Sequence, residues 1–201
     1  MTRKKVALFG GSFNPFGLHH RKIVELLLQY FDLVLVIICG LRPDKLSTNN
    51  VDSAHRLAMT KLSLLGLDPN RVRVEDFDLT RSVFTKCYEL QEMFASEGDI
   101  FHVVGGDLIC GGASGQSHVQ HWVKADLVWE TFNFAVIQRP GYVIQPEDLP
   151  PHSVVLSLEA EQGASSQEIR RRVASGESIS GIMVPQAEEY LSIHGLYKDT
   201  R

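Results

Sequence analysis

Cysteine, positive charge and long apolar runs are all scarce in this sequence of 201 residues. The three cysteines, Cys39, Cys87 and Cys110, lie far apart and form no C-x-x-C pair. We therefore expect reduced thiols rather than a disulfide framework. The formal net charge is −4, and the one basic run, 170–172, is short. Because surfaces that bind nucleic acids usually carry a basic stripe, we exclude a nucleic-acid polymer and favour a small phosphorylated ligand.

Targeting and membrane-spanning segments are lacking as well. The apolar run that follows the basic N-terminus, Val6–Phe9, is too short for the core of a signal peptide. The most apolar run, "LVLVIICG" (33–40), is far too short to span a bilayer. We therefore expect a cytoplasmic protein without a membrane partner.

Apolar and charged residues occur in the proportions of a globular protein, at 44% and 22%. We expect one domain over 1–201, which includes C-terminal helices at about 164–198. The predicted strands are Val6–Phe9, Leu33–Cys39, Val72–Phe77, Ile100–Val104, Phe134–Gln138 and Val154–Leu158. The predicted helices are Leu18–Tyr30, Asp52–Leu65 with Asp52 as N-cap, Thr85–Glu97, Ser166–Ala174 and Pro185–Ile193. Strands that alternate with helices predict an α/β fold with a Rossmann-like, doubly wound parallel sheet.

The stretch "VALFGGSFNPFGLHH" (6–20) places two glycines and two adjacent histidines between the first strand and the first helix. Ligands of doubly wound folds bind beyond the carboxyl ends of the strands. Glycines let backbone N–H groups approach a ligand, and a helix N-terminus favours an anion. Neither G-x-x-x-x-G-K-[ST] nor G-x-G-x-x-G is present. From these residues alone, a phosphate site and an ordinary turn with a solvated histidine pair both stay open.

A family resemblance extends over nearly the whole chain. "GGSFNPFGLHH" resembles the G-G-[ST]-F-[DN]-P-x-H-x-G-H signature of nucleotidyltransferases, most closely the nicotinate/nicotinamide mononucleotide adenylyltransferases. Four further stretches resemble later motifs of that family in the same order: "HVVGGDLI", "HWVKADLV", "VIQRPGY" and "SSQEIRRRVASGESISGIMVPQAEEYLSIHGLY". "SAHRLAMTKLSL" lies where the family has a helix bearing His and Arg. The resemblance implies the nucleotidyltransferase type of Rossmann-like fold.

The resemblance also implies an activity. Members of the family join ATP to a pyridine mononucleotide and release pyrophosphate, with Mg²⁺ accompanying ATP. The 5′-phosphate of the mononucleotide attacks the α-phosphorus of ATP in line, without a covalent enzyme intermediate. Catalysis of this kind consists of positioning and charge stabilisation. The partners implied are these small molecules, and a homo-oligomer is left open.

Individual residues receive roles from the same resemblance. The catalytic contacts fall to His20 and Arg170. The ATP-binding residues implied are Gly10, Gly11, Ser12, Phe13, His19, Lys45, Gly106, Asp107, Ser165 and Ser166. The mononucleotide-binding residues implied are Asn14, Thr85, Trp122 and Arg139. No residue is assigned to a metal.

Several of these residues can also be interpreted without the resemblance. Ser165 or Ser166 suits an N-cap, and Arg170 stands at i,i+4 from Ser166. A helix N-terminus beside an arginine suits a β/γ-phosphate. We expect Arg171 and Arg172 to form a solvated face instead. For the rest, the structural alternatives are a helix cap for Asp107, core packing for Trp122 and a solvated loop residue for Lys45.

The first departure from the family pattern lies in the signature itself. H-x-G-H is replaced by Gly17-Leu18-His19-His20, so the first histidine is missing. Successive residues of a helix point about 100° apart. We therefore expect that His19 does not replace the missing histidine unless the turn is rebuilt. A slow enzyme, a compensated enzyme and a binding protein without catalysis all stay open.

Two further departures concern loops. "RSVFT" (81–85) replaces the family's G-P-S-Y-T segment, so the choice between nicotinate and nicotinamide stays open. The Gly/Ser-rich loop 111–117 is expected to be a flexible lid. His118 and His121 have i,i+3 spacing, but no third ligand is near in sequence, so a solvated pair is favoured over a metal site.

Two other functions remain in competition. One is nucleotidyl transfer to another phosphate acceptor, such as phosphopantetheine or a sugar or polyol phosphate. The other is a nucleotide sensor without catalysis, suggested by Gly17. Trp122 and the length of the closing motif favour the pyridine substrate, and turnover distinguishes the enzyme from the sensor.

Overall fold

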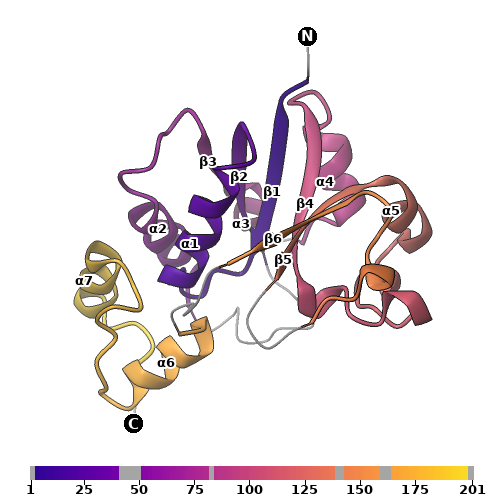
Figure 1. Ribbon diagram of the computed structural model, residues 1–201. Coiled ribbons are helices and arrows are strands. Elements are labelled where there is room, and N and C mark those ends of the chain that lie inside the picture. Colours follow the sequence, from indigo (N-terminus) through magenta and orange to yellow (C-terminus); the bar gives the residue numbers. More distant parts are fainter. Residues whose placement is uncertain (1–2, 41–50, 82–83, 139–142, 159–163, 199–201) are drawn as a thin grey trace. The chain divides into compact units, whose positions relative to one another are not determined.

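Six strands in the order β3-β2-β1-β4-β5-β6 form one sheet (Figure 1). The computed structural model describes residues 3–40, 51–81, 84–138, 143–158 and 164–198. The strands are β1 Lys5–Gly11, β2 Leu33–Ile38, β3 Val72–Glu75, β4 Asp99–Gly105, β5 Asn133–Gln138 and β6 Ser153–Ser157. The pairs β1–β4, β4–β5 and β5–β6 are parallel, with Val6 opposite Ile100 and Phe134 opposite both His102 and Ser153. This order is that of a doubly wound sheet, as predicted, and it reverses between β1 and β4.

The helices alternate with the strands. Their bounds are α1 Leu18–Leu27, α2 Ser53–Ser63, α3 Phe77–Arg81, α4 Cys87–Phe94, α5 Ala125–Thr131, α6 Ser166–Ala174 and α7 Pro185–Ile193. The predicted bounds of α6 and α7 are confirmed. Asp52 caps α2 as expected, because its side chain accepts a hydrogen bond of 2.8 Å from the Ala54 N–H. Sequence reasoning missed α5, a short helix of which Val128 is the buried residue.

Several predicted boundaries are wrong, for example that of α4, which extends over Cys87–Phe94 instead of Thr85–Glu97, and two of the others have a clear local cause. α1 ends at Leu27 instead of Tyr30, because the chain tightens there: the Gln29 and Tyr30 N–H groups donate to carbonyls three residues back, those of Leu26 and Leu27, at 3.0 Å each. Phe31 is buried, whereas Tyr30 is 55% exposed. β3 ends at Glu75 instead of Phe77, since the Asp76 carbonyl accepts from the Leu79 N–H at the start of α3. In both cases, hydrogen bonds of a turn end the helix or strand before the run of apolar residues in the sequence ends.

The chain divides into two compact units. Unit 1 comprises Met1–Phe9, Leu26–Leu35 and Thr85–Ala160, and unit 2 comprises Gly10–Glu25, Val36–Phe84 and Glu161–Arg201. Unit 1 has a buried cluster of Val104, Ile109, Val119, Val128, Phe132, Phe134 and Val136. The C-terminal helices therefore belong to unit 2, together with the turn that follows β1.

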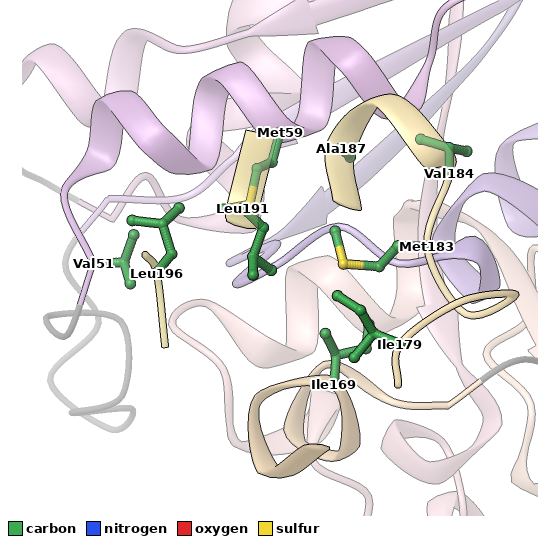
Figure 2. Packing of buried hydrophobic residues seen from close by; sticks show 9 residues of the cluster. All are labelled: Val51, Met59, Ile169, Ile179, Met183, Val184, Ala187, Leu191 and Leu196. Carbon is green, nitrogen blue, oxygen red and sulfur yellow. The ribbon is translucent and has the colours of Figure 1, made fainter. Parts of the chain in front are cut away.

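The core of unit 2 joins helices from distant parts of the sequence. Its buried members are Val51, Met59, Ile169, Ile179, Met183, Val184, Ala187, Leu191 and Leu196 (Figure 2). Met59 comes from α2, Ile169 from α6 and Leu191 from α7. Ile169 is fully buried, and burying such a side chain contributes about 1.5–3 kcal/mol. This anchor fixes the helix on which Arg170 lies.

The glycine-rich loop 111–117 is a folded element of unit 1. A 3₁₀ turn, Gly112–Ser114, is held by Asp148, whose Oδ1 accepts from the Ala113 N–H at 3.0 Å. The Gln120 side chain donates to the Gly112 carbonyl and accepts from the buried Ser117. The expectation of a flexible lid is wrong, because side chains outside the loop satisfy its backbone.

The state of the cysteines and the lengths of the helices agree with the expectations drawn from the sequence. Cys39, Cys87 and Cys110 are free. In the described ranges, no helix combines the length and the apolar character needed to cross a bilayer.

Candidate active site

The turn after β1 begins the site in unit 2. Phe13 has a φ of +43°, in the left-handed region that side chains rarely adopt. Its ring is buried and lies 5.0 Å, centroid to centroid, from the rings of both Phe16 and His20. A Cβ atom at Gly11 would lie 2.8 Å from the Phe13 ring, whereas one at Gly10 would meet nothing within 4 Å. The Phe13 ring therefore requires a glycine at position 11, whereas the space next to the Cα of Gly10 is empty.

Arg56 holds this turn from α2. Its Nη1 donates to the Ser12 carbonyl at 2.7 Å and to the Cys39 carbonyl at 3.0 Å. Arg56 is only 2% exposed, and this burial lowers the pKa of its guanidinium. Sequence reasoning gave Arg56 no role. A signal was present in the sequence. Arg56 precedes Met59 by three residues and Thr60 by four, so it lies on the face of α2 that these two residues bury.

α6 reaches the same turn from the far end of the chain. Ser165 is its N-cap, because the Ser165 Oγ accepts from the Glu168 N–H at 3.2 Å. Ser166 Oγ donates to the Pro15 carbonyl at 2.9 Å, and Arg170 Nη1 donates to the Asn14 carbonyl at 2.6 Å. The predicted cap is confirmed, and the i,i+4 pair lies against two successive carbonyls of the turn.

The neighbouring arginines face elsewhere. Arg171 contacts Glu168 at 2.8 Å and Glu177 at 2.6 Å, and Arg172 contacts Glu168 at 2.7 Å. Hydrogen bonds from both arginines lower the pKa of Glu168 to about 2. The prediction that Arg171 and Arg172 form a solvated face, apart from Arg170, is confirmed.

The two histidines begin α1. His20 Nδ1 accepts a hydrogen bond of 3.2 Å from the Gly17 N–H, which places the proton of the neutral ring on Nε2. The His19 and His20 rings lie 3.7 Å apart, centroid to centroid, at 42°. The expectation that these side chains diverge is therefore wrong for the rings, because the His20 ring turns back toward the N-terminus of the helix.

Asn14, in this turn of unit 2, and Tyr197, near the C-terminus, are bonded to each other. Asn14 is buried, and its Oδ1 accepts a hydrogen bond of 2.5 Å from the Tyr197 hydroxyl. Burial raises the pKa of Tyr197, against the opposing effects of Arg170 and Arg56. Sequence reasoning assigned Tyr197 no role, although its Leu-Tyr motif was noted. The Asn14 side chain lies toward Tyr197, and its expected contact with the mononucleotide stays a prediction.

Unit 1 carries Gly106 and Asp107, two of the residues expected to bind the nucleotide, directly after β4. Gly106 and Asp107 belong to a 3₁₀ turn, Gly106–Leu108, at the carboxyl end of that strand. A Cβ atom at the buried Gly106 would lie 2.9 Å from Ile144 Cδ1. Asp107 Oδ1 is a buried oxygen to which no group in the described ranges donates a hydrogen bond. An acceptor at the point where the strand order reverses suits a hydroxyl or a water of a nucleotide site.

Thr85 and Trp122, two of the residues expected to contact the mononucleotide, belong to unit 1. Thr85 is buried just before α4. Trp122 follows the 3₁₀ turn Val119–His121 and packs, half-buried, against the unit 1 cluster. The packing expected as its structural alternative is thus observed, and its expected contact with the pyridine ring stays a prediction. Lys45 and Arg139 lie outside the described residues, as do residues 82–83 of the segment expected to select the base.

His118 and His121 are exposed on the same 3₁₀ turn. In the part of the chain that the structure describes, no group of three His, Cys, Asp or Glu side chains is placed to hold a metal ion.

Comparison with known proteins identifies the family. A family model described as cytidylyltransferase-like matches residues 8–172. The chain belongs to the cytidylyltransferase-like family. A Thermus thermophilus protein named "Probable nicotinate-nucleotide adenylyltransferase" is 30% identical over 96% of this chain and all of its own length. An Enterococcus faecalis protein of the same name is 26% identical over 98% of this chain and 87% of its own.

A solved structure shares the fold of this cytidylyltransferase-like chain. It is the Plasmodium falciparum nicotinic acid mononucleotide adenylyltransferase complexed with NaAD, with a TM-score of 0.80 and 20% identity. The match covers 96% of this chain and 97% of that one. The resemblance inferred from the motifs is thereby confirmed for the family and the fold.

Proposed function

We propose that this protein transfers the adenylyl group of ATP to nicotinate mononucleotide. An oxygen of the mononucleotide 5′-phosphate forms a bond to the α-phosphorus of ATP. The bond from that phosphorus to the oxygen that bridges it to the β-phosphorus breaks, and pyrophosphate leaves with the electron pair. The products are nicotinate adenine dinucleotide and pyrophosphate. The names of the relatives support the choice of nicotinate.

One observation carries the proposal. Arg170 and Ser166 donate to the Asn14 and Pro15 carbonyls, so the N-terminal turn of α6 lies at the turn that leads to His20. A guanidinium, a helix N-terminus and an imidazole N–H are the groups that bind a polyphosphate and stabilise a leaving pyrophosphate. We assign His20 and Arg170 to that charge and Ser165 and Ser166 to the phosphate oxygens.

The remaining assignments follow the fold. The backbone of Gly10, Gly11, Ser12 and Phe13 is assigned to the nucleotide, as are Gly106 and Asp107 in unit 1. Thr85 and Trp122, together with Asn14 and Arg139, are assigned to the mononucleotide. The ring of Trp122 suits stacking on a pyridine, and its half-buried position supports this role.

Mg²⁺ fits the site as a companion of ATP rather than as an ion caged by protein. The described ranges bring together no set of three acidic, histidine or cysteine ligands. Mg²⁺ commonly keeps several waters and binds substrate phosphates with one or two carboxylates. We assign Asp107 Oδ1 as an acceptor for such a water, because no group in the described ranges donates a hydrogen bond to it. When bound, the ion supplies charge neutralisation to the phosphates.

Turnover with both mononucleotides tests the proposal. The protein is incubated with ATP, Mg²⁺ and either nicotinate or nicotinamide mononucleotide, and pyrophosphate and dinucleotide are measured. We expect both products, formed faster with nicotinate mononucleotide. His20→Ala is expected to lower kcat by about 10²–10³, by analogy with the loss of an oxyanion donor. The exposed His152, changed to Ala, is the matched control.

The outcomes separate the alternatives. ATP binding without dinucleotide from either substrate would contradict the proposal and favour a nucleotide sensor. Pyrophosphate release with a phosphopantetheine, sugar or polyol phosphate, but with neither pyridine mononucleotide, would assign a different acceptor. Equal rates for the wild type and His20→Ala would remove His20 from the mechanism.

A further inference from the structure

The chain leaves α7 through a fixed turn. The Gly195 N–H donates to the Ser192 carbonyl at 3.2 Å, and the Leu196 N–H donates to the Leu191 carbonyl at 3.1 Å. With Gly195 at a left-handed φ of +59°, these two bonds are those of a Schellman motif. Leu191 and Leu196 are both buried in the core of unit 2 (Figure 2). The backbone that leads into Tyr197 is therefore anchored in that core.

Tyr197 itself has a backbone conformation that bulky residues rarely adopt. Its φ is +60°, in the left-handed region. Such a conformation persists only where the surrounding structure holds it, and it occurs preferentially at functional sites. The turn after β1 contains a second such residue, Phe13, directly before Asn14. The hydrogen bond of 2.5 Å from the Tyr197 hydroxyl to Asn14 Oδ1 thus links two strained stretches, across 183 positions of sequence.

Both groups of this bond are in a defined state. Burial raises the pKa of the Tyr197 hydroxyl, against the opposing effects of Arg170 and Arg56, so the hydroxyl stays protonated and donates throughout the neutral range. Asn14 is only 2% exposed, and its Oδ1 is the acceptor. Because a carboxamide is planar, holding Oδ1 also sets the direction of the two protons on Nδ2.

The main chain of Asn14 is held separately. Its carbonyl accepts a hydrogen bond of 2.6 Å from Arg170 Nη1, on α6. The side chain and the main chain of Asn14 are therefore fixed by two different parts of the C-terminal segment. All of these residues belong to unit 2.

We propose that Tyr197 is a positioning residue for adenylyl transfer: its hydroxyl holds the Asn14 carboxamide in the orientation in which Nδ2 donates to an oxygen of nicotinate mononucleotide. The proposal rests on the proposed function, because the ligand is the acceptor substrate. Tyr197 acts through Asn14 and needs no contact with the ligand itself. A polar side chain that is ordered before the ligand arrives lowers the entropic cost of binding it.

Two tyrosines of the C-terminal segment form a matched pair for the test. Tyr197→Phe removes the hydroxyl that bonds to Asn14, whereas Tyr190→Phe removes one that bonds, at 3.0 Å, to His55 Nδ1 on α2. We expect Tyr197→Phe to raise KM for nicotinate mononucleotide about tenfold, as for the loss of one hydrogen bond, and to leave KM for ATP within about twofold. Tyr190→Phe is expected to leave both constants within about twofold of the wild type. Steady-state kinetics and the melting temperature are measured for each protein.

A double-mutant cycle with Asn14 separates positioning from general support of the fold. In Asn14→Ala the group that Tyr197 orients is gone, so adding Tyr197→Phe is expected to change KM for the mononucleotide by less than about twofold. A tyrosine that only stabilises the C-terminal segment would act equally in both backgrounds. An unchanged KM in Tyr197→Phe, or an equal increase with and without Asn14, would overturn the proposal.

Hydrogen exchange supplies a second measurement that needs no turnover. The Nδ2 protons of Asn14, followed by NMR of the isotopically labelled protein, are expected to exchange with solvent roughly tenfold faster in Tyr197→Phe than in the wild type or Tyr190→Phe. This difference in a protein that forms no dinucleotide would refute the proposed function and retain the hold of Tyr197 on Asn14. Equal exchange in the three proteins, with normal turnover, would retain the proposed function and remove the role of Tyr197.

Discussion

Two arginines at the turn after β1 bond to main-chain carbonyls. Arg56 donates to Ser12 and Cys39, and Arg170 donates to Asn14. A carbonyl oxygen satisfies a guanidinium donor without cancelling its charge. Arg171 is different, since it bonds to the carboxylates of Glu168 and Glu177. Positive charge is thus retained at the turn and neutralised on the outer face of α6.

Arg170 and Arg171 form a matched pair for mutation. Arg170→Ala is expected to lower kcat for adenylyl transfer by about 10²–10³, because the charge that we assign to the leaving pyrophosphate is lost. Arg170→Lys is expected to restore only part of the rate, since an ammonium lacks the planar fork. Steady-state kinetics with ATP and nicotinate mononucleotide measures both.

Arg171→Ala is the control for that experiment. It removes exposed ion pairs, so its kcat is expected to stay within about twofold of the wild type and its melting temperature to stay close to that of the wild type. An equal loss of rate in Arg170→Ala and Arg171→Ala would contradict the assignment of Arg170.

The sequence predicted that Arg170 differs from its neighbouring arginines, but it did not predict how the two histidine rings lie. The N-cap serine and the i,i+4 spacing predicted that Arg170 differs from its neighbours, since helix geometry fixes those relations. His19 and His20 lie in the first turn of α1, where no preceding turn restricts their rings. Their meeting depends on the open Cα of Gly17 and on Ile169, which lies far away in the sequence.

Helices and loops, too, were predictable where the cause lies in neighbouring residues and not where it lies far away in the sequence. The bounds of α6 and α7 and the cap of α2 were predictable because caps and apolar periods are local signals. Loop 111–117 was interpreted as a lid because glycine and serine are common in flexible segments. The residues that order it, Asp148 and Gln120, are not visible in its own composition.

Gly112→Ala tests whether that loop is part of the core structure. A Cβ atom there would lie 2.1 Å from the Asp148 carbonyl oxygen and 2.7 Å from the Trp129 ring. Because a backbone atom must shift, we expect the free energy of unfolding to fall by about 1–3 kcal/mol, measured by urea denaturation. Gly115→Asn, at a left-handed position with open space around it, is expected to cost less than about 1 kcal/mol. Equal stability of Gly112→Ala and the wild type would indicate a loose loop.

At the scale of the whole molecule, the alternation of strands and helices was sufficient to predict the sheet. Crossovers between parallel strands are restricted to few topologies, so the class followed from the order of elements. The buried polar groups could not be predicted in this way. His102 in β4 is buried and bonds to Cys87 Sγ at 3.2 Å and to Gln91 Oε1 at 3.0 Å. Burial raises the pKa of the Cys87 thiol to about 12, so this pair is a neutral part of the core.

His102 makes global stability depend on pH. Burial lowers the pKa of His102 to about 4, below its usual value of 6.5. The unfolded chain therefore takes up the proton first as pH falls. This contribution to stability is complete above pH 6.5 and is lost between about pH 6.5 and 4, to a total of about 3 kcal/mol. Urea denaturation at a series of pH values measures it.

His102→Phe is the comparison that isolates this contribution. Phenylalanine preserves an aromatic ring against Phe132, on which His102 stacks, and does not titrate. We expect the free energy of unfolding of His102→Phe to fall less steeply than that of the wild type between pH 6.5 and 4. Parallel curves for the two proteins would show that His102 is not the titrating group.

The hydrogen bonds from the C-terminal segment to the turn after β1 have a consequence for the synthesis of the protein. Ser166 and Pro15 are separated by 151 positions, and Tyr197 and Asn14 by 183. The turn leaves the ribosome long before its partners exist, and contacts of such large separation form slowly. The oldest stretch of the nascent chain therefore lacks these bonds until the youngest stretch has been made. A polypeptide released early, before the last helices, would carry the glycines and histidines of the turn and Arg56, but not the bonds from Ser166, Arg170 and Tyr197.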